Sequence, residues 1–166
     1  MTLDIWNGLC DKCNHKSCCN DYVTPFLSTK EFKDIQKLGY ENFADDVVIN
    51  DISGHALKKK SNSEECVFWS AQKGCTIYSN RPFDCKLFPF DIYKIDGVYM
   101  WVVYSCNPDS DWSWAEKMLE SFERELITTD VIKNLDAFSD LGRLDNSDKS
   151  YKYSVLRKVK LPIAGY

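Results

Sequence analysis

Residues 66–90 read CVFWSAQKGCTIYSNRPFDCKLFPF and place Cys66, Cys75 and Cys85 within one short stretch. Turn residues and aromatic side chains separate the three thiols, so each sulfur stands in a turn or beside a bulky apolar neighbour. A thiolate that binds a metal must be deprotonated and held by a stiff backbone, because the charge of the cation stabilises the clustered anions. The stretch therefore indicates one part of a metal site.

The other five cysteines extend this pattern. Cys10 and Cys13 form a C-x2-C pair, whose tight turn lets both sulfurs reach one ion. Cys18 and Cys19 are adjacent, and the side chains of neighbouring residues rarely bind the same ion. They therefore suggest two separate metal positions, or a cluster in which each cysteine binds a different iron atom. The alternative interpretation is a few buried structural cysteines plus a redox pair. Eight thiols make two sets of four, and we expect all of them to be metal ligands: Cys10, Cys13, Cys18, Cys19, Cys66, Cys75, Cys85 and Cys106.

Length and composition limit the class of protein. A chain of 166 residues with 44% hydrophobic residues can bury a core in one domain without disulfides. The first residues contain neither the basic nor the apolar region of a signal peptide, and no apolar run approaches a membrane span. We therefore expect a cytoplasmic protein with no membrane contact, in which cysteines serve metal or redox chemistry rather than disulfides.

The charge pattern argues against nucleic acid as a partner. The net charge is −4, and lysine and arginine are spread along the chain rather than gathered on one stripe. Residues 58–60 form a run of three lysines, which polar neighbours mark as a solvated loop. We expect no nucleic-acid binding.

Local patterns predict short helices and hairpins. Ser28 and Glu31 form a capping box for a helix that ends at Gly39. The dipeptide Asp96-Gly97, which type I′ turns prefer, predicts a hairpin. The expected elements are hairpin strands over 91–95 and 98–104, a helical turn over 40–46, a strand or buried extended segment over 47–49, a polar loop or hairpin tip over 54–63, a strand pair over 67–69 and 76–78 around the turn at Gly74, a short helix around Cys85 between Pro82 and Pro89, helices over 113–127 and 131–138, and an edge strand over 151–155.

These elements predict the α+β class. We expect one small domain over residues 1–166, with irregular cysteine-rich metal-binding loops, short β-hairpins and several helices. The chain contains no internal repeat and no convincing linker.

The motif order resembles the YkgJ-type cysteine-cluster family, whose members are described as zinc- or iron-chelating proteins. The resemblance rests on C-x2-C-x4-CC, C-V-F-W, G-C-T-I-Y, R-P-F-D-C-K-L-F-P-F and the last cysteine, and it covers about residues 10–106. It implies a metal-binding core, with residues 107–166 as a helical and strand extension. Flagellin lysine methylases have a similar cysteine set, which implies an enzymatic alternative with a protein substrate.

Four further residues are candidates beside the thiols. Arg81 could donate hydrogen bonds to cluster sulfurs or to an anionic substrate, or it could form a salt bridge to Asp84 or Asp91. With Tyr78 it is our candidate for cofactor binding. The two histidines, His15 and His55, stand in charged or polar loop sequence, and we interpret both as bystanders.

Three functions compete at this point. The first is a metal-binding protein whose cysteines ligate iron-sulfur clusters, of the 4Fe-4S kind, or zinc. The adjacent Cys18 and Cys19, with the resemblance, favour iron-sulfur. The second is an iron-sulfur-dependent enzyme of methyl or electron transfer, for which the sequence identifies no catalytic residue. The third is a zinc-stabilised interaction module that binds a protein partner.

Overall fold

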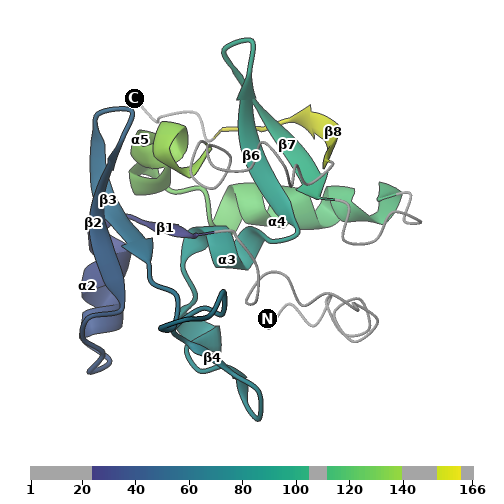
Figure 1. The fold of residues 1–166 in the computed structure, drawn as a ribbon. Helices are drawn as coiled ribbons and strands as arrows, with labels where there is room; N and C mark the ends of the chain where they lie inside the picture. The colour runs from purple at the N-terminus through teal and green to yellow at the C-terminus, as the bar shows by residue number, and fades with distance from the viewer. Residues whose placement is uncertain (1–23, 105–111, 140–152, 162–166) are drawn as a thin grey trace.

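The computed structural model describes residues 24–104, 112–139 and 153–161. Within these ranges the chain forms four α-helices and three small antiparallel sheets (Figure 1). This confirms the α+β class. The predicted cysteine-rich loop of residues 1–22 lies outside the described residues.

The first sheet has the strand order β1-β3-β2 and carries helix α2 beside it (Figure 1). The predicted capping box at the start of α2 is confirmed, because Ser28 Oγ accepts a hydrogen bond from the Glu31 N–H while the Glu31 carboxylate accepts one from the Ser28 N–H at 2.9 Å. Gly39, at φ +89°, turns the chain after the helix. The elements are β1 (Phe26–Leu27), α2 (Thr29–Gln36), β2 (Ala44–Ile49) and β3 (Ile52–Leu57).

The hairpin of β2 and β3 corrects two sequence predictions. The expected helical turn over 40–46 is wrong, since its second half belongs to β2, and the expected loop over 54–63 begins with four residues of β3. Asn50 and Asp51 both have positive φ and make the turn between the strands. The polar composition of these residues does not indicate strands. Pairing of β3 with β1 and β2 determines their conformation instead.

Gly54 in β3 shows how a distant contact fixes this strand. A Cβ atom at this position would collide with the Phe26 ring and lie 2.8 Å from the carbonyl oxygen of Leu27. The missing side chain therefore lets the ring of β1 lie directly on β3.

The stretch that begins at Cys66 forms a small lobe below the first sheet (Figure 1). The predicted strand pair is present but displaced, since the strands are Trp69–Ser70 and Gly74–Cys75 and the second lies before the predicted run 76–78. The predicted short helix that holds Cys85 is confirmed between Pro82 and Pro89. The elements of the lobe are β4 (Trp69–Ser70), β5 (Gly74–Cys75) and the 3-10 turn η2 (Tyr78–Asn80), after which α3 (Phe83–Leu87) lies beside β1 (Figure 1).

The remaining sheet has the order β6-β7-β8. Its hairpin is confirmed, with Asp96 at φ +49° and Gly97 at φ +78°, as a type I′ turn requires. The predicted edge strand is also confirmed, although it begins at Tyr153 in the described residues. The elements are β6 (Phe90–Ile95), β7 (Val98–Tyr104), η3 (Ser113–Ala115), α4 (Glu116–Glu125), α5 (Thr129–Phe138) and β8 (Tyr153–Lys158).

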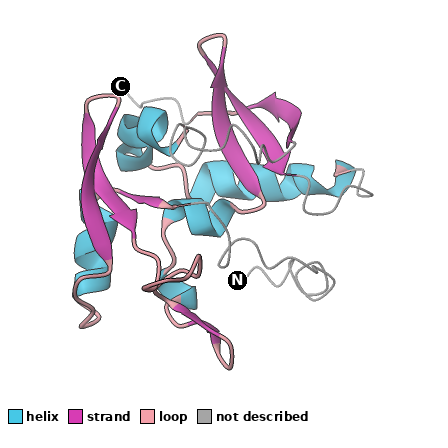
Figure 2. Ribbon diagram, in the orientation of Figure 1, coloured by secondary structure: helices cyan, strands magenta, loops and turns pink. Residues whose placement is uncertain are grey.

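Figure 2 shows how the helices lie against the strands. Two hydrophobic clusters hold these elements together. The larger joins the last sheet to α4 and α5, and it includes the fully buried Trp101 and Phe122. The smaller lies between α2, the β2–β3 hairpin and the lobe, and it consists of Leu27, Ile35, Phe43, Leu57, Phe68 and Ile77. None of the described helices has the length and apolar character needed to span a bilayer.

Candidate metal centre

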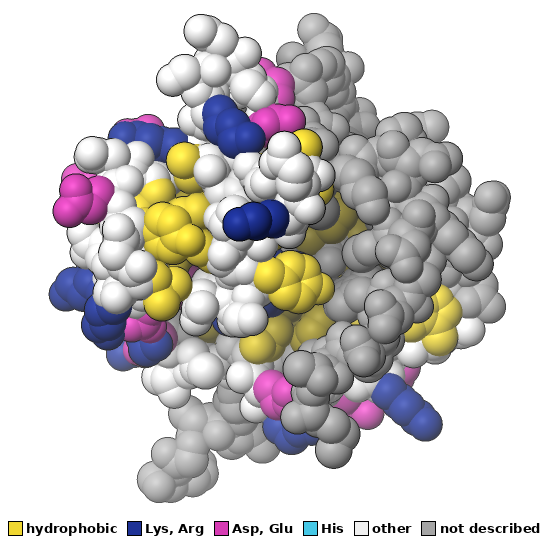
Figure 3. Space-filling view, turned by 90° about the horizontal axis from the view of Figure 1, so that it is seen from below, with side chains coloured by type: hydrophobic (Ala, Val, Ile, Leu, Met, Phe, Trp, Pro, Cys, Tyr) yellow, Lys and Arg dark blue, Asp and Glu magenta, His cyan; other side chains and the backbone are white. Residues whose placement is uncertain are grey.

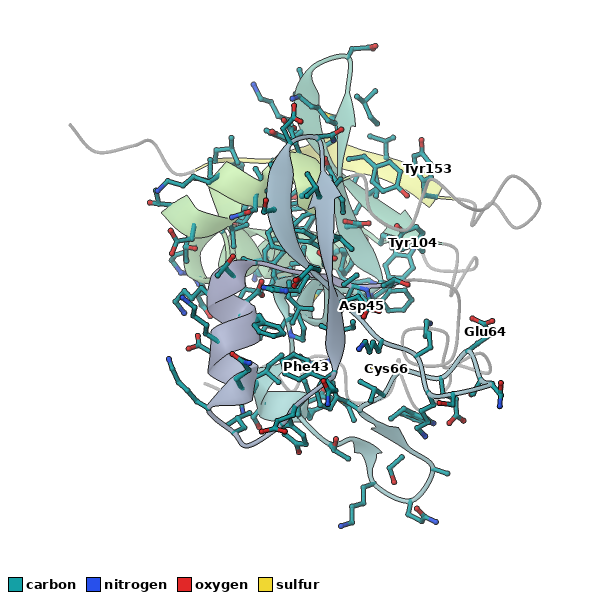
Figure 4. The ribbon with its side chains drawn as sticks, turned by 60° about the vertical axis from the view of Figure 1, so that its left-hand side comes forward. Phe43, Asp45, Glu64, Cys66, Tyr104 and Tyr153 are labelled. Atoms are coloured by element: carbon teal, nitrogen blue, oxygen red, sulfur yellow. The ribbon has the colours of Figure 1, made fainter. Side chains whose placement is uncertain are left out.

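Cys66, Cys75 and Cys85 come from three separate segments and meet at the smaller cluster. Cys66 pairs with Lys59 in an isolated bridge, Cys75 ends β5, and Cys85 lies in the middle of α3. All three side chains are half-buried and pack against the smaller cluster. Figure 4 shows Cys66 at the same end of the molecule as Phe43, a member of that cluster. The fold therefore places three of the predicted ligands against one apolar cluster.

The thiols also act on one another electrostatically. Burial raises the pKa of the Cys85 thiol well above its ordinary value; the charges of Asp84, Cys66 and Cys75 raise it further, while Arg81 opposes this. Burial likewise raises the pKa of Cys66, and Cys75 adds to the shift. Thiolates gathered here would repel one another, so a cation is needed to keep them deprotonated together. A set of soft sulfur donors suits zinc or iron, and the donor set therefore fits the expected metals.

The described residues do not complete a site by themselves. Within residues 24–104, 112–139 and 153–161, no group of three or more His, Cys, Asp or Glu side chains is placed to hold a metal ion. The other predicted ligands lie outside these ranges, as does His15, and their roles stay predictions: Cys10, Cys13, Cys18, Cys19 and Cys106.

Two carboxylates fix the helix that carries Cys85. Glu31 Oε1 accepts the Phe83 N–H at 2.6 Å, while Glu31 Oε2 accepts the N–H and the hydroxyl of Ser28 at 2.9 and 2.8 Å. Asp84 Oδ2 accepts the Phe26 N–H at 3.0 Å. The first turn of α3 is thereby tied to α2 and β1. The sequence indicates Glu31 only as part of a helix cap. Its second partner, the Phe83 N–H, lies 52 residues away and leaves no local pattern.

Replacing Glu31 by glutamine tests this anchor. An amide can still accept a hydrogen bond at one end, but its NH2 group cannot accept the Phe83 N–H, so a backbone donor loses its partner. We expect the free energy of unfolding to fall by about 1–3 kcal/mol, and metal affinity to fall by about 10–100-fold because Cys85 is less well positioned. Urea unfolding and competition with a zinc chelator would measure the two effects.

Asp34→Asn on the same helix is the matched control. Asp34 is exposed and pairs with Lys30 and Lys37 at the surface, at 2.9 and 2.7 Å. Its loss should cost less than about 1 kcal/mol and leave metal affinity unchanged. Equal effects of the two substitutions would contradict a role of Glu31 beyond the helix cap.

Arg81 lies near the thiols in a conformation that the sequence did not indicate. Its guanidinium carbon is 3.8 Å from the centre of the Tyr78 ring, and Nε donates to the Tyr78 carbonyl at 3.1 Å. Among the described residues, no carboxylate is within ion-pair distance of Arg81, so the expected salt bridge to Asp84 or Asp91 is absent there. The cofactor-binding role of Arg81 and Tyr78 stays a prediction.

His55 lies in β3 and not in a loop. Its Nδ1 is 2.8 Å from Asp46 Oδ1 on β2, and its ring stacks on the Phe32 ring of α2 with 3.8 Å between centroids. These contacts connect two strands of the first sheet with α2. They give His55 a packing role, and its interpretation as a bystander of the metal site stays a prediction.

Half-buried thiols gathered from separate segments are typical of a metal-binding protein. The family model described as "CxxCxxCC: Putative zinc- or iron-chelating domain" matches residues 9–107, which include all eight cysteines. The chain belongs to this family, which confirms the resemblance found in the sequence. The family name has two residues between its second and third cysteine, whereas this chain has four, residues 14–17. No solved structure matches the chain.

Proposed function

We propose that the eight cysteines hold one or two metal centres, iron-sulfur clusters or zinc, which organise the fold of this chelating domain. The supporting observation is the convergence of Cys66, Cys75 and Cys85 on one apolar cluster, inside a family match that contains the other five cysteines. An apolar surrounding excludes water and steadies thiolate ligands, as metal sites require. We also place the protein in the cytoplasm, where reducing conditions keep thiols available.

The cysteines and Arg81 have distinct roles in this proposal. Cys66, Cys75 and Cys85 supply thiolates, and the positive charge of Arg81 favours the thiolate form of Cys85. The adjacent Cys18 and Cys19 favour an iron-sulfur cluster, whose bound form supplies one-electron transfer, over zinc, which supplies a structural cross-link.

The metal content of anaerobically purified protein tests the proposal directly. Because eight thiols form two sets of four, we expect about two zinc ions per chain, or iron and sulfide in cluster ratio with a brown colour. Elemental analysis, sulfide determination and the visible spectrum would measure these quantities. Protein that is fully folded without metal, by circular dichroism and thermal unfolding, would contradict the proposal.

A further inference from the structure

The lobe that carries Cys66 and Cys75 departs from the charge of the rest of the chain. The whole chain has 25 acidic and 21 basic residues, but residues 66–83 contain Lys73 and Arg81 and no Asp or Glu. Residues 71–73, 76 and 78–80 are exposed. This stretch of an acidic chain therefore has a net positive charge.

The two cations of the lobe have no carboxylate partner among the described residues. Lys58 and Lys60, which precede the lobe, are by contrast neutralised by Asp45 and Glu65 at 3.1 and 2.7 Å. The positive charge of Lys73 and Arg81 thus has no carboxylate partner among the described residues, while that of Lys58 and Lys60 does.

Arg81 is held ready for a carboxylate. Its stacking on Tyr78 and its Nε hydrogen bond restrict the side chain, and neither contact engages its two terminal NH2 groups. A planar guanidinium binds a carboxylate through two parallel hydrogen bonds, and a side chain that is already ordered loses less entropy on binding. Tyr78 itself is 58% exposed and adds an aromatic contact of the kind that interfaces favour.

The surroundings of these residues indicate the class of partner. Figure 3 views the molecule from the side of the lobe and shows hydrophobic side chains in the middle of the face, with Lys or Arg among them. A nucleic acid needs a wider basic surface than two cations on a chain of net charge −4. An acidic segment that also carries apolar side chains complements this face in both charge and polarity.

We propose that Lys73, Tyr78 and Arg81 form a docking surface for an acidic segment of a partner protein. Cys75 lies in the same lobe, between Lys73 and Tyr78 in the sequence. A docked partner would therefore lie beside the candidate metal centre, where metal or electrons can be exchanged; this last step rests on the proposed function, whereas the docking itself does not.

Fluorescence anisotropy with a labelled peptide of glutamate and phenylalanine, added to the metal-loaded full chain at low salt, tests this surface. The double substitution Lys73→Glu and Arg81→Glu should weaken peptide binding by at least about tenfold. The charge-matched control is Lys117→Glu with Lys133→Glu, on exposed positions of α4 and α5, and it should leave binding unchanged. A peptide with glutamine in place of glutamate should not bind to the unsubstituted protein.

Three results would overturn the proposal. Equal weakening by both double substitutions would show a general effect of net charge. Full displacement of the peptide by citrate at equal carboxylate concentration would show a small-anion site, and tighter binding of oligothymidylate would show a nucleic-acid surface. Metal content and Tm are measured on the same samples. If a folded sample without metal still binds the peptide, the proposed function is contradicted and the docking surface is not.

Discussion

Replacing Cys85 by serine is expected to lower metal content and thermal stability together. A hydroxyl group is a poor ligand for zinc or iron, so the metal binds less tightly and its charge no longer offsets the repulsion between the remaining thiolates of Cys66 and Cys75. Affinity for the metal should fall by at least about 100-fold. Because binding to the folded state alone stabilises it, such a loss lowers the free energy of unfolding by about 2.7 kcal/mol when metal is in excess.

Elemental analysis and thermal unfolding, each with and without metal, would measure both effects of Cys85→Ser. The metal-free forms of the two proteins should differ much less in Tm than the loaded forms do. His15→Ala is the control, since we interpret His15 as a bystander, and it should keep its full metal content. Retention of all metal by Cys85→Ser would remove Cys85 from the ligand set, and loss of metal from His15→Ala would add His15 to it.

Replacing Glu123 by glutamine should destabilise the fold strongly. Glu123 is 7% exposed and accepts hydrogen bonds from Trp101 Nε1 at 2.9 Å, from Arg157 Nη1 at 2.6 Å and from the Lys160 N–H at 2.6 Å. The substitution leaves the Arg157 guanidinium partly buried without its main counter-charge. We expect a loss of about 3 kcal/mol, or roughly 10 °C in Tm.

Glu116→Gln provides the matched control for this network. Glu116 also accepts from Arg157, at 2.7 Å, but its side chain is exposed to solvent. Its loss should cost less than about 1 kcal/mol. If the two variants unfold at the same denaturant concentration, the network around Glu123 does not hold β8 to α4.

The pH dependence of the Glu123 effect has a defined sign. Burial pushes the pKa of Glu123 upward, but hydrogen bonds from Arg157, the Lys160 N–H and Trp101 outweigh it, so the pKa lies below its ordinary 4.5. A depressed pKa contributes stability above the unfolded value, and this contribution is lost as the pH falls through the folded value. The difference between the native protein and Glu123→Gln should therefore be constant at neutral pH and shrink below about pH 4.5.

Local sequence patterns were sufficient to predict those helices and hairpins whose conformation depends on their own residues. The helix after Ser28 follows from a cap and its reciprocal carboxylate, and the hairpin at Asp96-Gly97 follows from two residues that accept positive φ. The short helix around Cys85 follows from the prolines on either side of it. In each case the information lies within a few residues of the element.

Distant contacts explain what the sequence did not predict. The strand β3 contains Gly54 and His55, whose composition suggests a loop, yet the Phe26 ring and the pairing with β2 hold them in a sheet. The anchor of α3 on Glu31 and the stacking of Arg81 on Tyr78 depend on tertiary geometry in the same way. Cysteine spacing predicts the candidate site, because ligand chemistry restricts residue type more strongly than packing does, and the structure places three of the predicted thiols against one apolar cluster.

The segment that matches the family model is shorter than the part of the chain that shares one hydrophobic core. The match ends at residue 107, but Met118, Leu119 and Phe122 of α4 belong to the same hydrophobic cluster as Phe26 and Trp101. A chain cut at the end of the match would leave the indole of Trp101 and the apolar side of β6 and β7 open to water. A relative that consists of the chelating segment alone would therefore need another cover for this surface, supplied by different residues of its own chain or by a second protein.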